Sequence, residues 1–309
     1  MREYVGLSAA LAGLILIFGL ATDLFLTTAT FRVIANQIPA AVVLATAMTL
    51  VLISGGIDLS VGSVLALSGA VFGVCLVSWQ LPTVVAFAAC LGTGFACGAV
   101  NGVIVVRWQV PAFIVTLGMM EAARGLAYGV TGSQTRYLGV AADGFTSGLV
   151  AGVSPAILLA GLIVAGGHVL VTRTVFGRHL VAIGTNEEAV RLSGIDPRWP
   201  KAAVYALSGL LAAVAAVLYA SRLAAADPNA GTGAELQAIA AAVIGGTSLM
   251  GGRGSVVHTL FGVVLISVLA SGLAQAGAQE PTRRLITGCV IVAAAILDAY
   301  RHSRNLVNA

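Results

Sequence analysis

The chain has 309 residues, of which 59% are hydrophobic and 9% charged, whereas soluble globular domains carry about 25% charged residues. This composition excludes a soluble domain and predicts a single transmembrane domain over residues 1–309. The net charge of +4 comes from arginines in the connections between apolar stretches. The excess of positive charge therefore reflects membrane topology and does not indicate nucleic-acid binding.

Ten apolar stretches of roughly bilayer length follow one another along the chain. We expect spans near 5–22, 34–53, 60–78, 82–106, 110–130, 153–172, 202–221, 235–250, 255–275 and 283–300. With the N-terminus inside, ten basic residues lie in cytoplasmic segments: Arg2, Arg107, Arg173, Arg178, Arg191, Arg198, Lys201, Arg253, Arg301 and Arg304. Five lie outside: Arg32, Arg136, Arg222, Arg283 and Arg284. This bias predicts an all-α polytopic protein of about ten spans, or eight or nine, with both termini cytoplasmic.

The connection between the second and third predicted spans is glycine-rich instead of polar. It reads ISGGIDLSVGS over residues 53–63 and contains Gly55, Gly56 and Gly62. Glycines let the backbone turn sharply, and Asp58 and Ser60 are suited to cap the following helix. Irregular backbone within a membrane is tolerated only where protein or a water-filled cavity covers it. Asp58 is therefore either a capping residue in a tight turn or part of a functional, re-entrant break.

Four neutral polar residues within or at the edges of spans are candidates for a translocation path: Asn36, Asn101, Thr116 and Gln237. Uncharged hydrogen-bonding groups suit the passage of a neutral, hydroxylated solute, and no ring of acids or bases indicates an ion. The same groups would equally suit hydrogen bonds between helices.

Two charged residues, Glu121 and Arg124, lie three positions apart in the fifth predicted span and hence on one helix face. A charge within the membrane marks a functional site by default. Because each has a partner at hand, we expect a buried ion pair with a structural role. The alternative is that the pair lines the pathway.

The longest polar segment, residues 173–201, separates the sixth and seventh predicted spans and holds five of the basic residues. Thr185-Asn186 can cap a short helix whose first turn contains Glu187 and Glu188, where acids suit the helix dipole. Gly194 is suited to end that helix. A capped helix between two spans indicates a docking element, and the alternative is a solvated connector.

A second glycine-rich break, GGTSLMGGRGS over residues 245–255, contains Gly245, Gly246, Gly251 and Gly252. Shifted by 192 residues, the sequence Gly62-Ser63-Val64 falls on Gly254-Ser255-Val256. This echo predicts a weak two-fold repeat with halves near 1–150 and 200–309, joined through residues 173–201. Coincidence is the alternative, since small residues recur in any tight helix bundle.

Three blocks of the sequence resemble one transporter family. Glu188-Ala189-Val190, followed after three residues by Gly194, is similar to the EAA loop of ABC importer permeases, with Val190 in place of the second alanine. The wider stretches FGRHLVAIGTNEEAVRLSGI, SGGIDLSVGS and GTGAELQAIAAAVIGGTSLMGG resemble the monosaccharide branch, the ribose, xylose and arabinose permeases. The resemblance covers about residues 33–300.

The resemblance implies the pore subunit of an ATP-driven sugar importer in the bacterial cytoplasmic membrane. Its implied partners are an ATPase that docks on Glu187, Glu188, Ala189 and Gly194, a periplasmic or lipid-anchored sugar-binding protein, and a second permease, either a copy or a sister. ATP and Mg²⁺ would bind to the ATPase, and we expect no cofactor or metal on this chain. The alternatives are a permease for another small solute, such as a branched-chain amino acid, and an ATP-independent carrier.

The absence of catalytic motifs also favours a transport subunit over an enzyme. A P-loop needs a lysine after glycine, but the sole lysine, Lys201, follows Pro200. The sequence also has no H-E-x-x-H and no G-x-S-x-G. We therefore expect a transport subunit that takes its energy from a partner, and not an enzyme.

Overall fold

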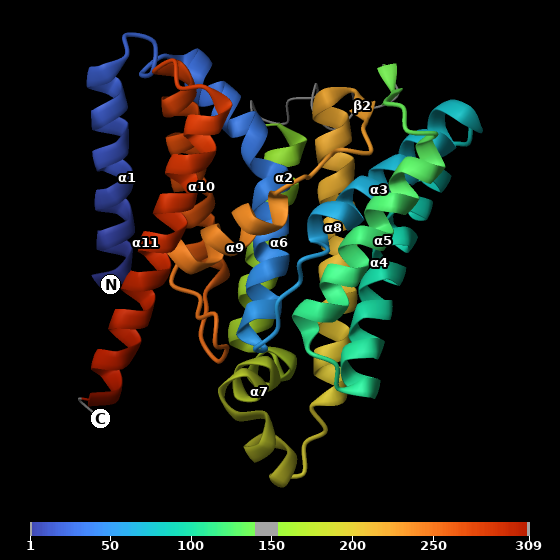
Figure 1. Ribbon diagram of the computed structural model, residues 1–309, viewed down its shortest axis with the longest axis vertical. Helices are drawn as coiled ribbons and strands as arrows, with labels where there is room; N and C mark the ends of the chain where they lie inside the picture. Colours follow the sequence, from blue (N-terminus) through green and yellow to red (C-terminus); the bar gives the residue numbers. More distant parts are fainter. Residues whose placement is uncertain (1, 140–153, 308–309) are drawn as a thin grey trace.

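The computed structural model describes residues 2–139 and 154–307, and it is built almost entirely of helices (Figure 1). In chain order these are α1 (Arg2–Ala21), α2 (Thr28–Ile53), α3 (Val61–Gly73), the π-helix η1 (Val74–Ser78), α4 (Thr83–Trp108), α5 (Ala112–Thr131), α6 (Pro155–Arg173), α7 (Val175–Leu192), α8 (Arg198–Leu223), α9 (Ala234–Ile244), α10 (Val256–Gln275) and α11 (Glu280–Val307). Two short strands, β1 (Arg136–Tyr137) and β2 (Ala225–Ala226), pair antiparallel and were not predicted.

The prediction of an all-α membrane protein is confirmed. Six helical segments in the described part of the chain are long and apolar enough to cross a bilayer: α2, α3 continued by η1, α4, α6, α8 and α10. Every predicted span contains a helix, although residue 153 of the sixth lies outside the described residues. The count of about ten full spans is not established by these helices.

One predicted span is wrong. The sequence predicts a span over 235–250, but α9 ends at Ile244 after 11 residues. The predicted span was extended to Leu249 and Met250, but the helix stops before them and the backbone turns at Gly245 and at Gly246, which has φ +82°. A helix of this length covers only about half of the hydrocarbon thickness.

The core of the bundle is formed around α2 and α8. The residues of α2 from Val42 to Ile53 are all buried. On the other side of α8, the glycines of α4 let the two backbones meet, because a Cβ on Gly98 would lie 3.0 Å from the Cα of Gly209. Close approach through small residues is how helices pack tightly within a membrane. This contact holds α4 against α8, and α8 packs separately against α2.

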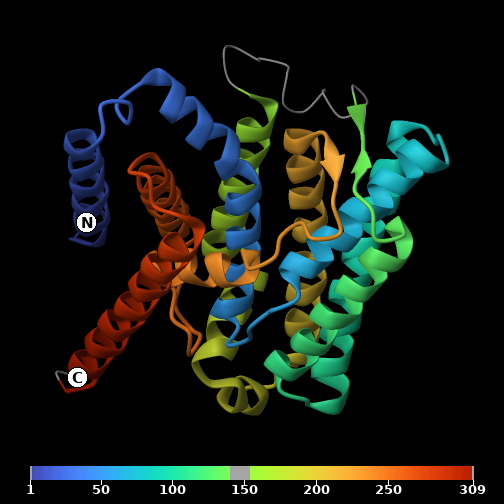
Figure 2. The ribbon, with the colours of Figure 1, turned by 45° about the horizontal axis from the view of Figure 1, so that its top comes forward.

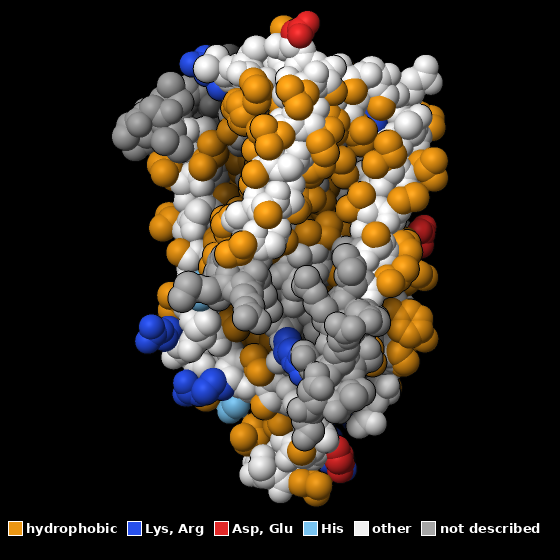
Figure 3. All heavy atoms as spheres, turned by 90° about the vertical axis from the view of Figure 1, so that its left-hand side faces the viewer, with side chains coloured by type: hydrophobic (Ala, Val, Ile, Leu, Met, Phe, Trp, Pro, Cys, Tyr) orange, Lys and Arg blue, Asp and Glu red, His pale blue; other side chains and the backbone are white. Residues whose placement is uncertain are grey.

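Helix α7 lies at one end of the bundle, below the other helices in Figure 1. The N-terminal end of α1 and the C-terminal end of α11 are the ends of those helices nearer to α7 (Figures 1 and 2). Figure 3 shows hydrophobic side chains over much of the α1 face and basic side chains gathered toward the α7 end. The C-terminal end of α11 lies at the level of α7 in Figure 1, whereas the N-terminal end of α1 lies near the middle of the molecule's height. The side of the membrane on which the two termini lie therefore stays a prediction.

Candidate functional site

Helix α7 consists of two helices joined at a kink. Asn186 has non-helical φ −162° and ψ 98°, and its side-chain Oδ1 accepts a hydrogen bond of 2.9 Å from the amide of Ala189. Asn186 therefore caps a second helix that begins at Glu187, as predicted. The preceding helix, which begins at Val175, was not predicted. Thr174 caps it, because the Thr174 Oγ1 accepts a hydrogen bond of 3.1 Å from the amide of Gly177.

The second helix of α7 ends where glycine was expected to end it. Gly194 has φ +85°, which favours glycine because a Cβ would strain this conformation. Its amide donates to the carbonyl of Arg191 at 3.1 Å, and the amide of Ile195 donates to the carbonyl of Val190 at 3.3 Å. These two bonds form a Schellman motif, which satisfies the last helical carbonyls.

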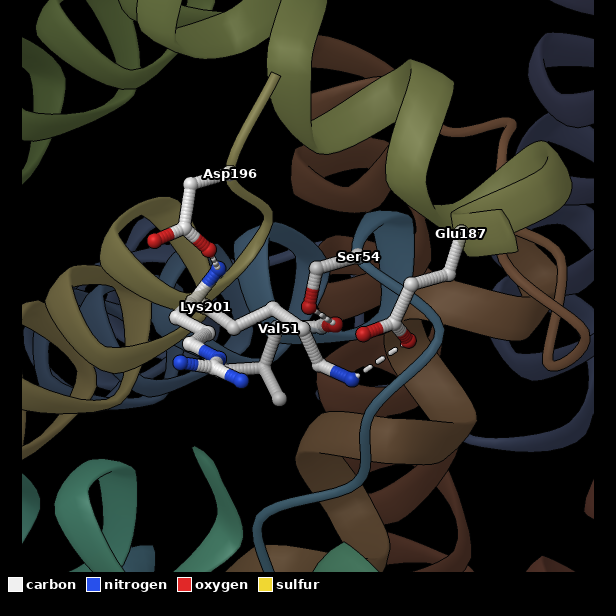
Figure 4. Close-up of polar contacts among 6 residues, drawn as sticks. Val51, Ser54, Glu187, Asp196 and Lys201 are labelled. Atoms are coloured by element: carbon white, nitrogen blue, oxygen red, sulfur yellow. Dashed lines mark hydrogen bonds and ion pairs between the residues drawn. The ribbon is translucent and has the colours of Figure 1, made fainter. Parts of the chain in front are cut away.

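The α7 tip, residues 187–197, is tied to the start of α8, and both expose apolar groups. Lys201 of α8 donates to Glu187 at 2.8 Å across the gap between the helices (Figure 4). Leu192 and Trp199 are 78% and 72% exposed at this polar end of the molecule. Large exposed apolar side chains among charges are typical of surfaces that bind another protein.

A half-open cleft of about 760 Å³ lies beside the α7 tip. Its walls are the α7 tip, the connection between α4 and α5, and the start of α8, and Gly55 and Gly56 of the first break also reach it. Figure 4 shows Ser54, bonded to Val51 at the end of α2, in the same view as the Glu187–Lys201 pair, and the adjoining Gly55 and Gly56 line the same cleft as that pair. The first break thus reaches the surface that the α7 tip presents.

Both glycine-rich breaks meet on the first helix of α7, at a contact we call the glycine junction (Ile53, Gly55, Gly184, Gly251 and Gly252). The amide of Gly252 donates to the carbonyl of Ile53 at 2.9 Å. A Cβ on Gly251 would lie 2.8 Å from the Cα of Gly55, and one on Gly184 would lie 2.5 Å from the amide nitrogen of Gly252. Only glycines allow three backbones to approach this closely. The sequence indicates each break, but not that they touch each other or α7.

Asp58 anchors the first break to α8. Its Oδ1 accepts from the amide and hydroxyl of Ser60 at 3.0 and 2.6 Å, and its Oδ2 accepts from the hydroxyl of Ser208 at 2.7 Å. Ser60 is the N-cap residue of α3 and no side chain caps the first helical amides, so the bonds from Ser60 to Asp58 close a tight turn before the helix and Asp58 does not cap it. The bond to Ser208 adds a link between helices, which the sequence does not indicate.

Two of the path candidates join the first break. Asn101 donates to the hydroxyl of Ser60 at 3.0 Å. The single hydroxyl hydrogen of Thr116 lies between two acceptors, the carbonyl of Ala112 in its own helix at 3.0 Å and that of Ile57 in the first break at 3.2 Å. Both side chains are fully buried. Within this chain Asn101 and Thr116 therefore link α4 and α5 to the first break through hydrogen bonds, as the alternative interpretation expects.

The other two candidates lie apart from these and from each other. Asn36 is exposed and lines a cavity of about 140 Å³ with Ser154 and Arg222. Gln237 is exposed on α9 beside a smaller cavity between α2 and α10. The four candidates do not form one continuous passage within a single copy of the chain.

The predicted buried ion pair is wrong. Arg124 donates through Nη1 to the carbonyls of Pro228 and Ala230 at 2.6 and 2.8 Å, and Glu121 is exposed. The backbone between β2 and α9 is not helical, so its carbonyls are free to accept from the guanidinium. Glu121 remains on the outer side of α5.

This geometry makes the two charges unequal for stability. We expect Arg124→Leu to lower the melting temperature clearly, because hydrogen bonds to a charged group contribute about 1.5–3 kcal/mol and the carbonyls would lose their donor. Glu121→Gln should leave it nearly unchanged. Thermal unfolding of the detergent-purified chain measures both. If both variants lowered the melting temperature equally, the result would instead support an ion pair between Glu121 and Arg124.

Together, the helical bundle, the two broken helices and the polar helix α7 that joins them define a membrane-transport subunit. The chain belongs to the family described as branched-chain amino acid transport system / permease component, whose model matches residues 30–295. It is a transport component, and the family resemblance inferred from the three sequence blocks is confirmed.

Curated relatives cover nearly the whole chain. The ribose import permease protein of Escherichia coli K12 is 38% identical over 96% of this chain and 94% of its own length. The corresponding protein of Bacillus subtilis 168 is 38% identical over 92% and 89%. The xylose transport system permease protein of Escherichia coli K12 is 33% identical over 96% and 92%. No solved structure matches the chain.

Proposed function

We propose that this chain is the pore subunit of an ATP-driven importer of a small neutral monosaccharide. The observation that carries the proposal is the 38% identity with ribose import permeases over almost the full length of both chains. The family description names branched-chain amino acids, so an amino-acid permease is the second candidate. The identity to ribose and xylose permeases favours the sugar.

The proposal assigns the α7 end to the cytoplasm of a bacterial inner membrane, together with both termini. An ATPase that carries ATP and Mg²⁺ would dock on the α7 tip, where Glu187, Glu188, Ala189 and Gly194 lie beside the exposed Leu192 and Trp199. A sugar-binding protein would deliver the solute at the opposite end. A second permease, either a copy or a sister subunit, would complete the pore.

The glycine junction suggests how force would travel from the ATPase into the membrane. A push on α7 reaches both breaks at once, because Gly184 lies against Ile53 and Gly252. Each break joins a helix that ends there to one that begins there, namely α2 to α3 and α9 to α10. We propose that these pairs are equivalent parts of two related halves, near 1–150 and 200–309; residues 140–150 lie outside the described chain.

Reconstitution tests this function. Vesicles that contain the chain, an ATPase and a binding protein from neighbouring reading frames should accumulate labelled ribose or xylose when ATP is supplied on the ATPase side. The chain alone should neither hydrolyse ATP nor accumulate sugar, since it has no P-loop lysine. Accumulation by the chain alone would contradict the proposal, and uptake of leucine but no sugar would favour the second candidate.

A further inference from the structure

Helix α5 carries a carboxylate on its outer side at the middle of its length. Glu121 is the tenth residue of this 20-residue helix and is exposed. At a rise of about 1.5 Å per residue it lies roughly 15 Å from either helix end. Gly118, Ala122 and Gly125 are exposed beside it, and a Cβ built on either glycine would meet nothing within 4 Å. The space in front of Glu121 is therefore open.

The same face continues into the run of turns between β2 and α9, residues 227–233. This segment descends from the end opposite α7 to the middle of the molecule (Figure 1). Tyr128 of α5 donates to the side-chain oxygen of the exposed Asn229 at 2.6 Å, and Arg124 binds the backbone at Pro228 and Ala230. Asn229 and Thr232 are exposed along the segment, and Gln237 is exposed on α9. A polar strip thus joins one end of the bundle to Glu121 at mid-depth.

Contact with lipid is excluded for such a face on physical grounds. Lipid tails do not satisfy a carboxyl group at the middle of a helix or the exposed polar side chains of Asn229 and Thr232. A dry contact with a second copy is also unfavourable. A two-fold axis along the membrane normal brings the same Glu121 to the same depth from both sides, and Arg124 is already engaged with carbonyls. Water in front of the face removes both difficulties.

We propose that the α5 face (Gly118, Glu121, Ala122 and Gly125), together with residues 229–237, lines the aqueous passage, and that Glu121 accepts hydrogen bonds from solute hydroxyl groups. An ionised carboxylate is an acceptor with two oxygens, and its hydrogen bonds are stronger than those of neutral groups. The glycines leave room for the solute ring. The role assigned to Glu121 rests on the proposed sugar transport, whereas the aqueous character of the face does not.

Cysteine reactivity tests the aqueous character without any solute. Single cysteines at Gly118 and Gly125, in a background that lacks the four native cysteines, should react with a charged, membrane-impermeant methanethiosulfonate in the assembled importer. A cysteine at Gly161 should not react. Gly161 is an equally open glycine of α6, beside the exposed Leu158 and Leu162. Unreactive α5 cysteines overturn the proposal, and so do cysteines that only cross-link to a second copy.

Uptake measurements test the role of the face. Gly125→Trp should reduce uptake at least tenfold while the ATPase still co-purifies, and Gly161→Trp should leave uptake near wild type. Glu121→Gln should raise KM several-fold, and Glu121→Leu should raise it further. Normal uptake by Gly125→Trp and Glu121→Leu would overturn the assignment. A wild-type importer that takes up no monosaccharide would instead overturn the proposed function, and cysteine reactivity would still decide whether the face is aqueous.

Discussion

Replacing Gly184 by valine is expected to abolish ATP-driven uptake. The new Cβ would collide with the carbonyl oxygen of Ile53 and lie 2.5 Å from the amide nitrogen of Gly252. Both obstacles are backbone atoms, and they belong to two different segments, so neither can rotate away as a side chain would. Overpacking a well-packed site costs about 1–3 kcal/mol. We expect α7 to separate from the breaks, with a lower melting temperature and at most a few per cent of wild-type uptake.

A matched control and a second variant separate this effect from a general loss of folding. Ala182→Val adds methyl groups to the same helix at an exposed position and should leave uptake intact. Gly251→Ala approaches the junction from the second break, where φ is +86° and the Cβ would lie 2.8 Å from the Cα of Gly55. It should reproduce the Gly184→Val phenotype. Normal uptake in both junction variants would show that α7 does not act through the breaks.

Local chemistry explains what the sequence could predict. Apolar length places a helix in each predicted span. The cap at Asn186 and the stop at Gly194 follow from groups that lie within a few residues of one another, namely the amide of Ala189 and the carbonyls of Val190 and Arg191. Such features depend on neighbours in the chain, and the sequence states those neighbours directly.

Features that depend on distant neighbours were missed. The early end of α9 was missed because Leu249 and Met250, which follow the four residues Gly-Gly-Thr-Ser after Ile244, lengthen the apolar stretch that the hydropathy pattern detects. Arg124 was paired with Glu121, its neighbour in sequence, although its acceptors lie more than 100 residues away. The glycine junction likewise joins residues near 53, 184 and 252. Spacing alone gives no sign of contacts of this kind.

The second prediction with a large expected effect concerns the α7 tip and the binding of the ATPase. Glu188→Lys removes the exposed pair with Arg191 at 2.7 Å, and an exposed ion pair contributes about 0–1 kcal/mol. It also reverses a charge at a helix N-terminus, where the dipole contributes about 0.3–1 kcal/mol. These losses are too small to unfold the bundle. A like charge placed in an interface can cost several kcal/mol of association. We therefore expect normal membrane levels but loss of the co-purifying ATPase and of uptake.

Gly194→Trp should give the same uncoupling by a different route. A Cβ at Gly194 would meet nothing within 4 Å, but the residue has φ +85°, so the tryptophan strains the Schellman turn and projects from the docking surface without disturbing the packing below. Val175→Lys is the matched control, because Val175 is 56% exposed at the base of α7, away from the α7 tip. It should retain the ATPase and most of the uptake.

The measurement is the amount of ATPase that co-purifies per permease, together with initial uptake rates. If Glu188→Lys and Gly194→Trp both keep the ATPase bound and transport normally, the α7 tip is a connector and the ATPase must engage another surface at this end of the bundle.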